Sequence, residues 1–442
     1  MLTARFPQKT RLHLAPVTAI AIAVASCVAP PAFPQTAQRA RAANAGLTAA
    51  RSLAASRQFP EAIAAYQKLL GTQPTNETAQ LELAACYRQV HNEDEARRIL
   101  QRARREHPRS AAAGKALGNF ELEAQSFDAA IAALKAALAL APGDLEARNY
   151  LASAYQSKGD TARAHAQLDF VLARDPQNQL ARYLRAQILA DAGQDQPALA
   201  DAESVVAARP DYLPGRVLLA KILVRLKQCS RAAETLRPTA NAAPLDTQEL
   251  FLLANAYDCS GRPELAKSVR DEFAEASRAD RTRAENETQS KHLTERANDL
   301  ARQNLFPQAL ELLQQALDKD AKNGFAYSQQ AKIFFSMHDA ARARQAIDQA
   351  LALQPFQPDF LYVAGIIAES DSRIQEALAS FEKVTQINPK EADAYFEIGK
   401  IHLQQGDRRA ALAAFRHAAT LDPSEPGYRR AADSLATEPK TH

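Results

Sequence analysis

The sequence predicts an all-α protein, an α-solenoid of about eleven helical hairpins, and three observations support this prediction. Prolines recur at a step of 34 residues, a period typical of repeat architectures. An alanine recurs at the same step, twelve residues before each proline. Helix-forming residues fill the intervals. The prolines form two series, Pro74, Pro108, Pro142, Pro176, Pro210 and Pro244, and then Pro355, Pro389 and Pro423.

Three columns of residues define the expected hairpin when each proline is placed at position 32 of a 34-residue repeat. Position 20 is alanine in all eleven repeats, position 8 is alanine or glycine, and position 24 is large and apolar in most. By the 3.6-residue period, position 8 lies on one stripe of a first helix, and positions 20 and 24 lie on one stripe of a second. Small residues at positions 8 and 20 allow the two backbones to approach closely.

This succession of small, small, large apolar and proline residues resembles the tetratricopeptide repeat family. The resemblance implies stacked hairpins whose first helices line a concave groove that binds polypeptide partners. The chain departs from the family pattern in its first large column, because it contains no tryptophan.

Signals for the helix ends recur as well. Glycine occupies position 15 of four repeats, where the first helix must reverse, and glycine tolerates the positive φ that such a reversal requires. The proline at position 32 is expected to end each second helix. The four glycines are Gly159, Gly193, Gly261 and Gly406.

The repeats divide into two arrays, residues 43–280 with seven repeats and residues 290–425 with four. Residues 281–289 are a junction, because the spacing exceeds a whole number of periods by nine residues. The charged segment around the junction predicts either a flexible hinge or an elongated second helix of the seventh repeat. The lack of proline between Pro263 and Pro307 favours the helix. Residues 426–442 are expected to form a capping helix and a tail.

The amino-terminal residues 1–26 have the pattern of an export signal, with basic residues followed by the apolar stretch LAPVTAIAIAVAS. The tetrapeptide VASC resembles the bacterial lipobox, which implies a lipid on Cys27. Ordinary cleavage and an unmodified cysteine are the alternatives. Residues 27–42 are expected to be an extended tether. The prediction is an exported, periplasmic protein, either anchored to the membrane through its lipid or soluble after cleavage.

Two further cysteines, Cys229 and Cys259, fall near facing turns of the sixth and seventh repeats. Stacking of hairpins would bring these turns together, and an exported protein meets an oxidising compartment. The sequence therefore predicts a disulfide, with two free thiols near turns as the alternative. Cys86 is expected to be a buried packing residue.

Catalytic and metal-binding patterns are absent from the sequence. The nine histidines show no metal-ligand spacing, and there is no glycine-rich phosphate loop or nucleophile elbow. We therefore expect no enzymatic activity, no metal and no cofactor. The formal charge of +3, without a strongly basic stripe, argues against nucleic acid as a partner.

In the tetratricopeptide family, the first helix of each repeat lines the groove through positions 2, 5, 9, 12 and 13. The resemblance implies partner contacts in repeats three to seven, where amides suit extended peptide backbone, and an apolar or aromatic surface in repeats nine to eleven. The alternative is that these residues form solvated faces and contacts between repeats. The candidates are Lys115, Asn119, Asn149, Ser153, Gln156, Tyr183, Gln187, Asp191, Lys221, Arg225 and Asn255 in the first set, and Phe335, Tyr362 and Phe396 in the second.

Some family members clamp a terminal carboxylate with Lys and Asn on successive repeats. Lys115 and Asn119 match the first pair of that clamp, but Tyr150, Leu180 and Leu184 occupy the other places. No such clamp is predicted. The expected function is a non-catalytic scaffold that binds protein or peptide segments, in a bacterial envelope assembly. The alternatives are a carbohydrate-binding or transferase adaptor of a polysaccharide system, and a cytoplasmic scaffold.

Overall fold

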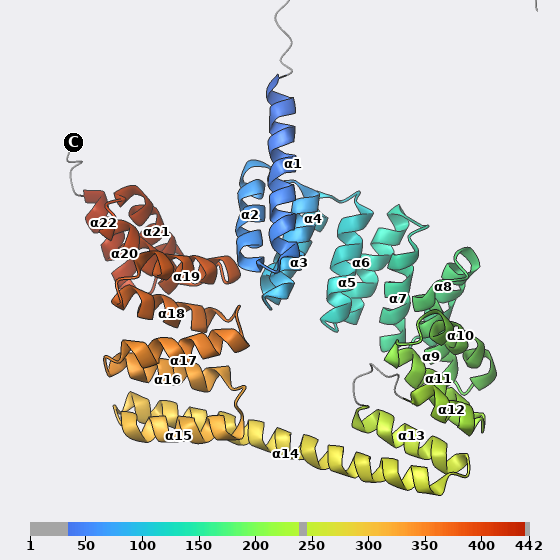
Figure 1. Cartoon of the computed structure of the whole chain (residues 1–442). Coiled ribbons are helices and arrows are strands. Elements are labelled where there is room, and N and C mark those ends of the chain that lie inside the picture. The colour runs from blue at the N-terminus through green and yellow to red at the C-terminus, as the bar shows by residue number, and fades with distance from the viewer. Residues whose placement is uncertain (1–33, 238–244, 438–442) are drawn as a thin grey trace, which may run out of the picture. The chain divides into compact units, whose positions relative to one another are not determined.

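The computed structural model describes residues 34–237 and 245–437, which form 22 α-helices and no strand (Figure 1). The chain divides into two compact units, Met1–Asn44 and Ala45–His442. The described residues of the first unit belong to α1, and the second unit contains the hairpins. The predicted all-α solenoid of helical hairpins is confirmed.

Consecutive helices pair into antiparallel hairpins, one for each repeat, and α14 serves both the seventh and the eighth. The first array contains α1 (Pro34–Ala55), α2 (Phe59–Thr72), α3 (Glu77–Gln89), α4 (Glu93–Glu106), α5 (Ala111–Glu123), α6 (Phe127–Leu140), α7 (Leu145–Ser157), α8 (Thr161–Arg174), α9 (Gln179–Asp191), α10 (Asp195–Ala208), α11 (Leu213–Arg225), α12 (Cys229–Leu236), α13 (Thr247–Cys259) and the start of α14 (Pro263–Arg302). The second array continues with α15 (Phe306–Lys319), α16 (Gly324–Ser336), α17 (Ala340–Leu353), α18 (Pro358–Ser370), α19 (Ile374–Ile387), α20 (Ala392–Gln404), α21 (Arg408–Leu421) and the capping helix α22 (Pro426–Thr437).

The reversal inside every hairpin uses a left-handed residue at position 15. Four of these residues are the predicted glycines, with φ between 70° and 82°. The other seven carry side chains, and the left-handed region costs such residues roughly 1–2 kcal/mol each. The turn geometry is therefore imposed by the hairpin packing even where the residue disfavours it. The seven are Arg57, His91, Gln125, Lys227, Asn304, His338 and Ser372, with φ between 56° and 61°.

The core follows the predicted columns. All eleven alanines at position 20 are completely buried, from Ala62 to Ala411. Most large residues at position 24 are also buried, including Leu134, Phe381 and Phe415. Position 8 faces them closely: a Cβ atom added to Gly365 would lie 2.6 Å from Cε1 of Phe381. The small columns therefore exist because the two helices leave no room for a larger side chain at their crossing.

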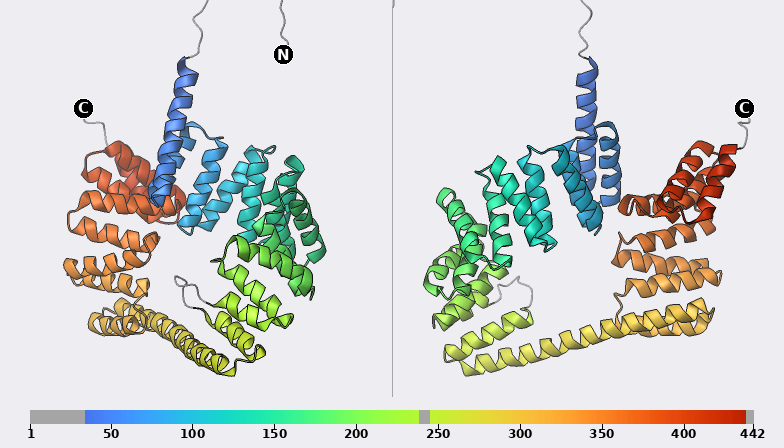
Figure 2. Two further views of the ribbon diagram at one scale, coloured as in Figure 1. Left: turned by 45° about the vertical axis from the view of Figure 1, so that its right-hand side comes forward. Right: turned by 180° about the vertical axis from the view of Figure 1, so that it is seen from behind.

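The junction between the arrays is a single helix. The 40 residues of α14 run without interruption through residues 277–288, in agreement with the favoured prediction (Figure 2). Its buried residues lie near its two ends, with Ala266 and Val269 in the seventh repeat and Ser290, Thr294 and Ala297 in the eighth. The stretch between them is largely exposed, so helix propensity and charge rather than packing stabilise it.

One second helix ends earlier than predicted. In the sixth repeat α12 stops at Leu236, whereas the sequence pattern places the stop at Pro244. Pro238 explains the difference, because the residue before a proline avoids the helical region, and Arg237 has φ −52° and ψ 130°. The buried guanidinium of Arg216 donates hydrogen bonds to the carbonyl oxygens of Thr235 at 2.7 Å and Arg237 at 2.5 Å.

The amino-terminal predictions are corrected in one respect. Residues 34–42 begin α1 instead of forming part of an extended tether. Alanine, glutamine and arginine after Pro34 are good helix formers, and proline is tolerated at a first helical position. The export signal at 1–26, Cys27 and the rest of the tether lie outside the described residues. Among the helices that the structure describes, none is both long and apolar enough to cross a membrane.

The two cysteines of the sixth and seventh repeats meet as the sequence predicts. Cys229 begins α12 and Cys259 ends α13, and the structure records a disulfide between them. Their Cα atoms are 5.7 Å apart, inside the range that a disulfide requires. Cys86 is a buried free thiol, and burial raises its pKa to about 11.

Candidate functional site

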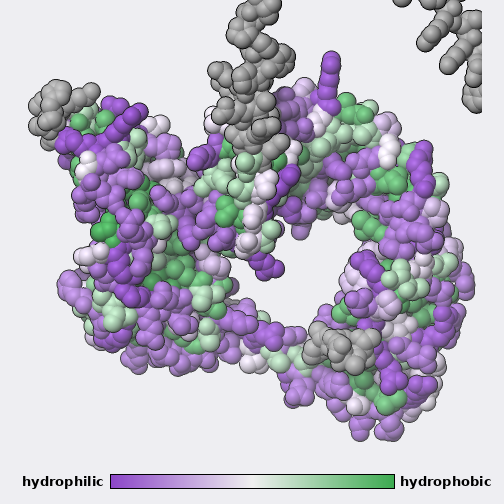
Figure 3. All heavy atoms as spheres, turned by 45° about the horizontal axis from the view of Figure 1, so that its top comes forward, coloured by the Kyte–Doolittle hydropathy of each residue, from purple (hydrophilic) through white to green (hydrophobic). Residues whose placement is uncertain are grey.

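The first helices of successive repeats touch one another from α3 to α13 in the first array and from α14 to α18 in the second. Contacts join α3 to α5, α5 to α7, α7 to α9, α9 to α11 and α11 to α13 in the first array. In the second, they join α14 to α16 and α16 to α18. We call the surface of α5, α7, α9, α11 and α13 the amino-terminal face. Figure 3 shows that the visible surface is mostly hydrophilic, with separate small hydrophobic areas.

Several candidates on the amino-terminal face are engaged within the chain. The ammonium group of Lys115 lies 2.7 Å from a carboxylate oxygen of Glu146 and 3.1 Å from one of Asp144. Asn119 donates a hydrogen bond to Glu123 at 3.1 Å. Because two carboxylates already neutralise Lys115, this pair is unsuited to clamp a partner's carboxylate, in agreement with the sequence prediction.

The prediction that Asn149 contacts a partner in the groove is wrong, because its side chain is only 3% exposed and does not line an open face. Its amide donates at 3.1 Å to the side-chain oxygen of Asn178, which in turn accepts from the backbone N–H of Ala181 and caps α9. The side chain therefore fixes the joint between two repeats. In this repeat position 5 lies against the next hairpin. The recurrence of residues at one position does not show how close that position lies to the neighbouring repeat.

Tyr183, Gln187 and Arg225 also have partners within the array. Gln187 donates to the hydroxyl of Tyr183 at 3.2 Å, and the Tyr183 ring packs edge-on against Tyr212 at a centroid distance of 5.6 Å. Arg225 pairs with Asp195 at 2.6 Å. These contacts agree with the alternative interpretation of the three residues, in which they form contacts between repeats and not with a partner. Parts of each side chain are still accessible.

The remaining candidates on this face are accessible and unpaired. Lys221 and Asp191 are exposed, and Ser153, Gln156 and Asn255 are half-buried. In the described part of the chain, none of these five side chains has a recorded hydrogen bond or ion pair. They provide donors and acceptors on four successive first helices, which is the arrangement that an extended peptide backbone can use.

The aromatic candidates of the second array fall into two groups. Phe396 packs between Phe415 and Tyr428, with centroid distances of 5.3 and 5.1 Å, so it contributes mainly to the core beneath α22. Phe335 and Tyr362, by contrast, line a pocket of about 510 Å³. The Tyr362 ring rests against buried Phe381 at 5.4 Å, which fixes its orientation.

This pocket, which we call the acidic pocket, has an apolar floor and a charged rim. Its floor comes from α18 and α19, and its rim from α16, the start of α18 and the start of α20. Three carboxylates and one ammonium group belong to it. The lining residues are Lys332, Phe335, Ser336, Pro358, Asp359, Tyr362, Val363, Ile366, Ile367, Val384, Glu391 and Asp393.

The electrostatics of the acidic pocket are dominated by carboxylates. Burial, reinforced by the charges of Asp393 and Asp359, raises the pKa of Glu391. Burial, reinforced by the charges of Glu397 and Asp393, raises the pKa of the Tyr362 hydroxyl. Each of these two groups thus ionises less readily in its site than in water, first because burial disfavours the charged form and then because other negative charges lie nearby.

The three pocket carboxylates were not among the sequence candidates. Asp359 and Asp393 occupy position 2 of successive repeats, and Glu391 precedes the first helix of the eleventh repeat. Reading position 2 as a column would have found the two aspartates. Their proximity to Glu391 depends on how one repeat stacks on the next, which the sequence does not show.

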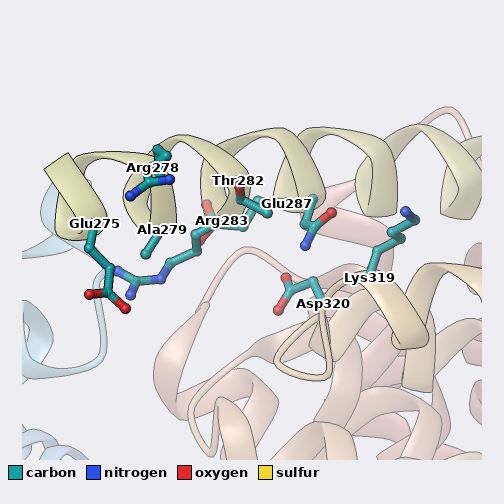
Figure 4. Close-up of a pocket in the computed structure, with 9 residues that line it drawn as sticks. Glu275, Arg278, Ala279, Thr282, Arg283, Glu287, Lys319 and Asp320 are labelled. Carbon is teal, nitrogen blue, oxygen red and sulfur yellow. The ribbon is translucent and has the colours of Figure 1, made fainter.

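A second hollow lies along the exposed stretch of α14, with a volume of about 600 Å³. Figure 4 shows that Glu275, Arg278, Arg283 and Glu287 extend from this helix, while Lys319 and Asp320 lie across from it. Three acidic and three basic side chains line the hollow, so it has no preference for one sign of charge. No group of three or more potential metal ligands occurs among the described residues.

The antiparallel hairpins and the face formed by their first helices define an α-helical repeat scaffold. A tetratricopeptide repeat family model matches residues 53–119, 121–188 and 369–435, and a second model of that description matches residues 328–392. The chain belongs to the tetratricopeptide repeat family. Arrays of this family are in general non-catalytic scaffolds for protein interaction.

Among curated proteins, the chain is similar to tetratricopeptide repeat protein 6 of Homo sapiens, with 30% identity over 125 residues, covering 28% of this chain and 24% of that protein. It is 27% identical over 244 residues to cellulose synthase operon protein C of Pseudomonas fluorescens (strain SBW25), covering 54% and 18%. The Hsp70-Hsp90 organizing protein of Triticum aestivum is 32% identical over 95 residues, covering 22% and 16%. The matched regions span about a quarter or less of these relatives.

Among solved structures, the chain is similar to the APC/C hetero-tetramer Cut9-Hcn1, with 12% identity and a TM-score of 0.31, covering 91% of this chain and 98% of that chain. It is also similar to the crystal structure of MamA, with 16% identity and a TM-score of 0.29, covering 31% and 81%.

Proposed function

We propose that this protein is a scaffold that binds an extended segment of a partner polypeptide along its amino-terminal face. The observation that carries the proposal is the row of unpaired polar side chains on successive first helices, which includes Gln156 on α7, Lys221 on α11 and Asn255 on α13. An extended backbone offers N–H and C=O groups at regular intervals, and amides satisfy both. The hairpins beneath fix the backbones that carry these side chains, so binding has to order the side chains but not the helices.

The proposed setting is an assembly of the bacterial cell envelope, with Cys27 as the lipid attachment site. The basic and apolar pattern of residues 1–26 and the sequence VASC support export. The paired cysteines Cys229 and Cys259 are compatible with an oxidising compartment. Cell fractionation tests this setting: the protein should accompany the membranes, and Cys27→Ala should release it. A protein that stays in the cytoplasm contradicts export.

The binding proposal is tested with a variant that replaces Gln156, Lys221 and Asn255 by alanine. Partners are captured from envelope extract, and the amount of each recovered protein is compared with that recovered by the parent. Loss of several polar contacts should reduce recovery of the true partner at least tenfold, because each hydrogen bond contributes roughly 0.5–1.5 kcal/mol.

A matched control replaces Lys135, Gln196 and Ser268 by alanine. These are exposed polar residues on second helices of the same array, and none has a recorded partner among the described residues. The control should recover the partner as the parent does. Equal recovery by parent, variant and control would exclude the amino-terminal face as the binding surface.

A second candidate function is an adaptor of a polysaccharide system. The similarity to cellulose synthase operon protein C, which extends over more than half of this chain, supports this candidate. It predicts binding to an immobilised glycan panel or recovery of a glycosyltransferase from the extract. Recovery of non-glycan assembly proteins together with a blank glycan panel would reject it.

A further inference from the structure

The acidic pocket of the second array has three features that together define the chemistry of an occupant. It is deep enough to hold one long side chain, at about 510 Å³. Its floor is apolar, from Val363, Ile366, Ile367 and Val384, and Phe335 and Tyr362 provide aromatic rings. Its rim carries the carboxylates of Asp359, Glu391 and Asp393.

Within residues 34–237 and 245–437, the carboxylates of the rim have no recorded ion pair with a cationic side chain. Asp393 accepts a hydrogen bond from the hydroxyl of Tyr428, and Glu391 accepts one from the amide of Asn388 at 2.9 Å. Both donors are neutral, so the two negative charges persist. Asp359 is exposed and has no recorded hydrogen bond or ion pair within the described residues.

The nearby cations do not compensate these charges. Lys400, on α20, is held by Glu397 and lies 3.7 Å from Glu369, so its charge is shared between two other carboxylates. Lys332 is the single cation among the lining residues, against three carboxylates. The pocket therefore attracts positive charge and repels an acidic or carboxy-terminal group.

We propose that the acidic pocket binds a basic side chain of a partner polypeptide, arginine in preference to lysine. The methylene stem lies on the apolar floor, and the guanidinium reaches the rim carboxylates, as long basic side chains commonly divide between apolar and polar surroundings. Arginine is favoured because its planar head stacks on aromatic rings and forms paired hydrogen bonds with carboxylates. The proposal rests on the proposed function, since it takes the occupant to be part of a partner polypeptide.

The raised pKa of Glu391 supports this assignment independently of the cavity shape. The ionised form of a partly buried carboxyl group that faces two other carboxylates is disfavoured in the free protein, and an incoming guanidinium would relieve that repulsion. Strain of this kind is commonly kept where binding requires it.

The test uses the full chain and a random nonapeptide library displayed on beads. Peptides retained by the parent protein should be enriched in arginine, and less strongly in lysine, at one position. The best peptide is then synthesised with arginine or with citrulline, which keeps the shape of the side chain and removes its charge. Its affinity for the parent should fall at least tenfold on that exchange.

The pocket variant combines Asp359→Asn and Glu391→Gln, and the matched control combines Asp348→Asn and Glu382→Gln. The control removes the same net charge from exposed positions on the second helices α17 and α19 of the same array. The pocket variant should lose the preference for arginine over citrulline, whereas the control should keep it within twofold.

Three results would overturn the proposal: no enrichment of basic residues, equal affinity for the arginine and citrulline peptides, or equal losses in the pocket variant and the control. Equal losses in the pocket variant and the control would indicate that the basic peptide is attracted by the overall negative charge of the array and does not bind in the pocket. Because the amino-terminal variant is assayed separately by partner recovery, failure of arginine selection leaves the proposed function standing. Arginine selection together with equal recovery of the partner by the parent, the amino-terminal variant and its control would instead reject the amino-terminal face.

Discussion

Repeats three to seven and repeats nine to eleven have the same hairpin architecture but expose side chains of different chemistry. The buried alanine at position 20 is identical in both regions. In the first region the accessible residues are uncharged amides and single charges, many already paired within the array. In the second they are aromatic rings beneath a carboxylate rim. The positions that build the hairpin are therefore separable from those that define what it binds.

The two regions also differ in how their hairpins are held together. The first array has a disulfide between its sixth and seventh repeats, whereas repeats nine to eleven have no cysteine at all. The second array fills position 24 with Phe381 and Phe415, and glycine faces each of them at position 8. A covalent bond supports one region and tight aromatic packing the other. Separate substitutions can test each.

The largest effect is expected from the disulfide. Cys259→Ser opens a loop with a sequence separation of 30 residues. The chain-entropy treatment of such a loop gives a loss of about 3–4 kcal/mol in the free energy of unfolding. Urea denaturation of the oxidised protein measures the loss.

Reduction provides the control for this substitution. The parent with dithiothreitol should unfold at the same urea concentration as the oxidised Cys259→Ser variant, and reduction should leave that variant unchanged. If the oxidised parent and the variant have equal midpoints, the two thiols are unpaired in solution and the alternative of two free cysteines is correct.

The next largest effect is expected where glycine meets phenylalanine. Gly365→Ala would place a Cβ atom 2.6 Å from the ring of Phe381, which is completely buried. Overpacking of this kind typically costs about 1–3 kcal/mol. Because the Phe381 ring packs against Tyr362, the substitution should also disturb the position of the Tyr362 ring in the acidic pocket.

Gly143→Ala is the matched control in the first array. A Cβ atom at Gly143 would meet nothing within 4 Å, so the free energy of unfolding of this variant should differ from that of the parent by no more than about 0.5 kcal/mol. Thermal or urea denaturation of both variants checks the pair. Equal small changes would mean that the helix crossing is looser than the structure shows.

The hairpin architecture could be predicted from sequence because its determinants are local and repeated. Ala130 and Pro142 each stand in a column, and repetition separates such a signal from chance. The early end of α12 was missed because Pro238 occurs once, outside every column. The helical start of α1 was missed because no column covers residues 34–42.

The candidate sites were less predictable because they depend on contacts between repeats. Asn149 and Asn255 both occupy groove columns, yet Asn149 is buried against the cap of the next helix and Asn255 is not. The acidic pocket requires Asp359 and Glu391 to meet although they are 32 positions apart. Only the stacking of hairpins brings such residues together.

The smallest predicted effect concerns the left-handed turns, which contain glycine in some repeats of each array and a residue with a side chain in the others. Position 15 is glycine at Gly159 in the first array but serine at Ser372 in the second, with φ of 77° and 61°. Ser372→Gly should stabilise the second array by about 0.5–1 kcal/mol, because relief of the steric cost of positive φ is partly offset by the greater freedom of glycine in the unfolded chain. Gly159→Ser should destabilise the first by a similar amount, since no atom lies within 4 Å of the added Cβ and only the backbone is strained. Urea midpoints should therefore shift in opposite directions, and a shift of the same sign in both would show that the serine side chain supports its turn in a way that outweighs the backbone strain.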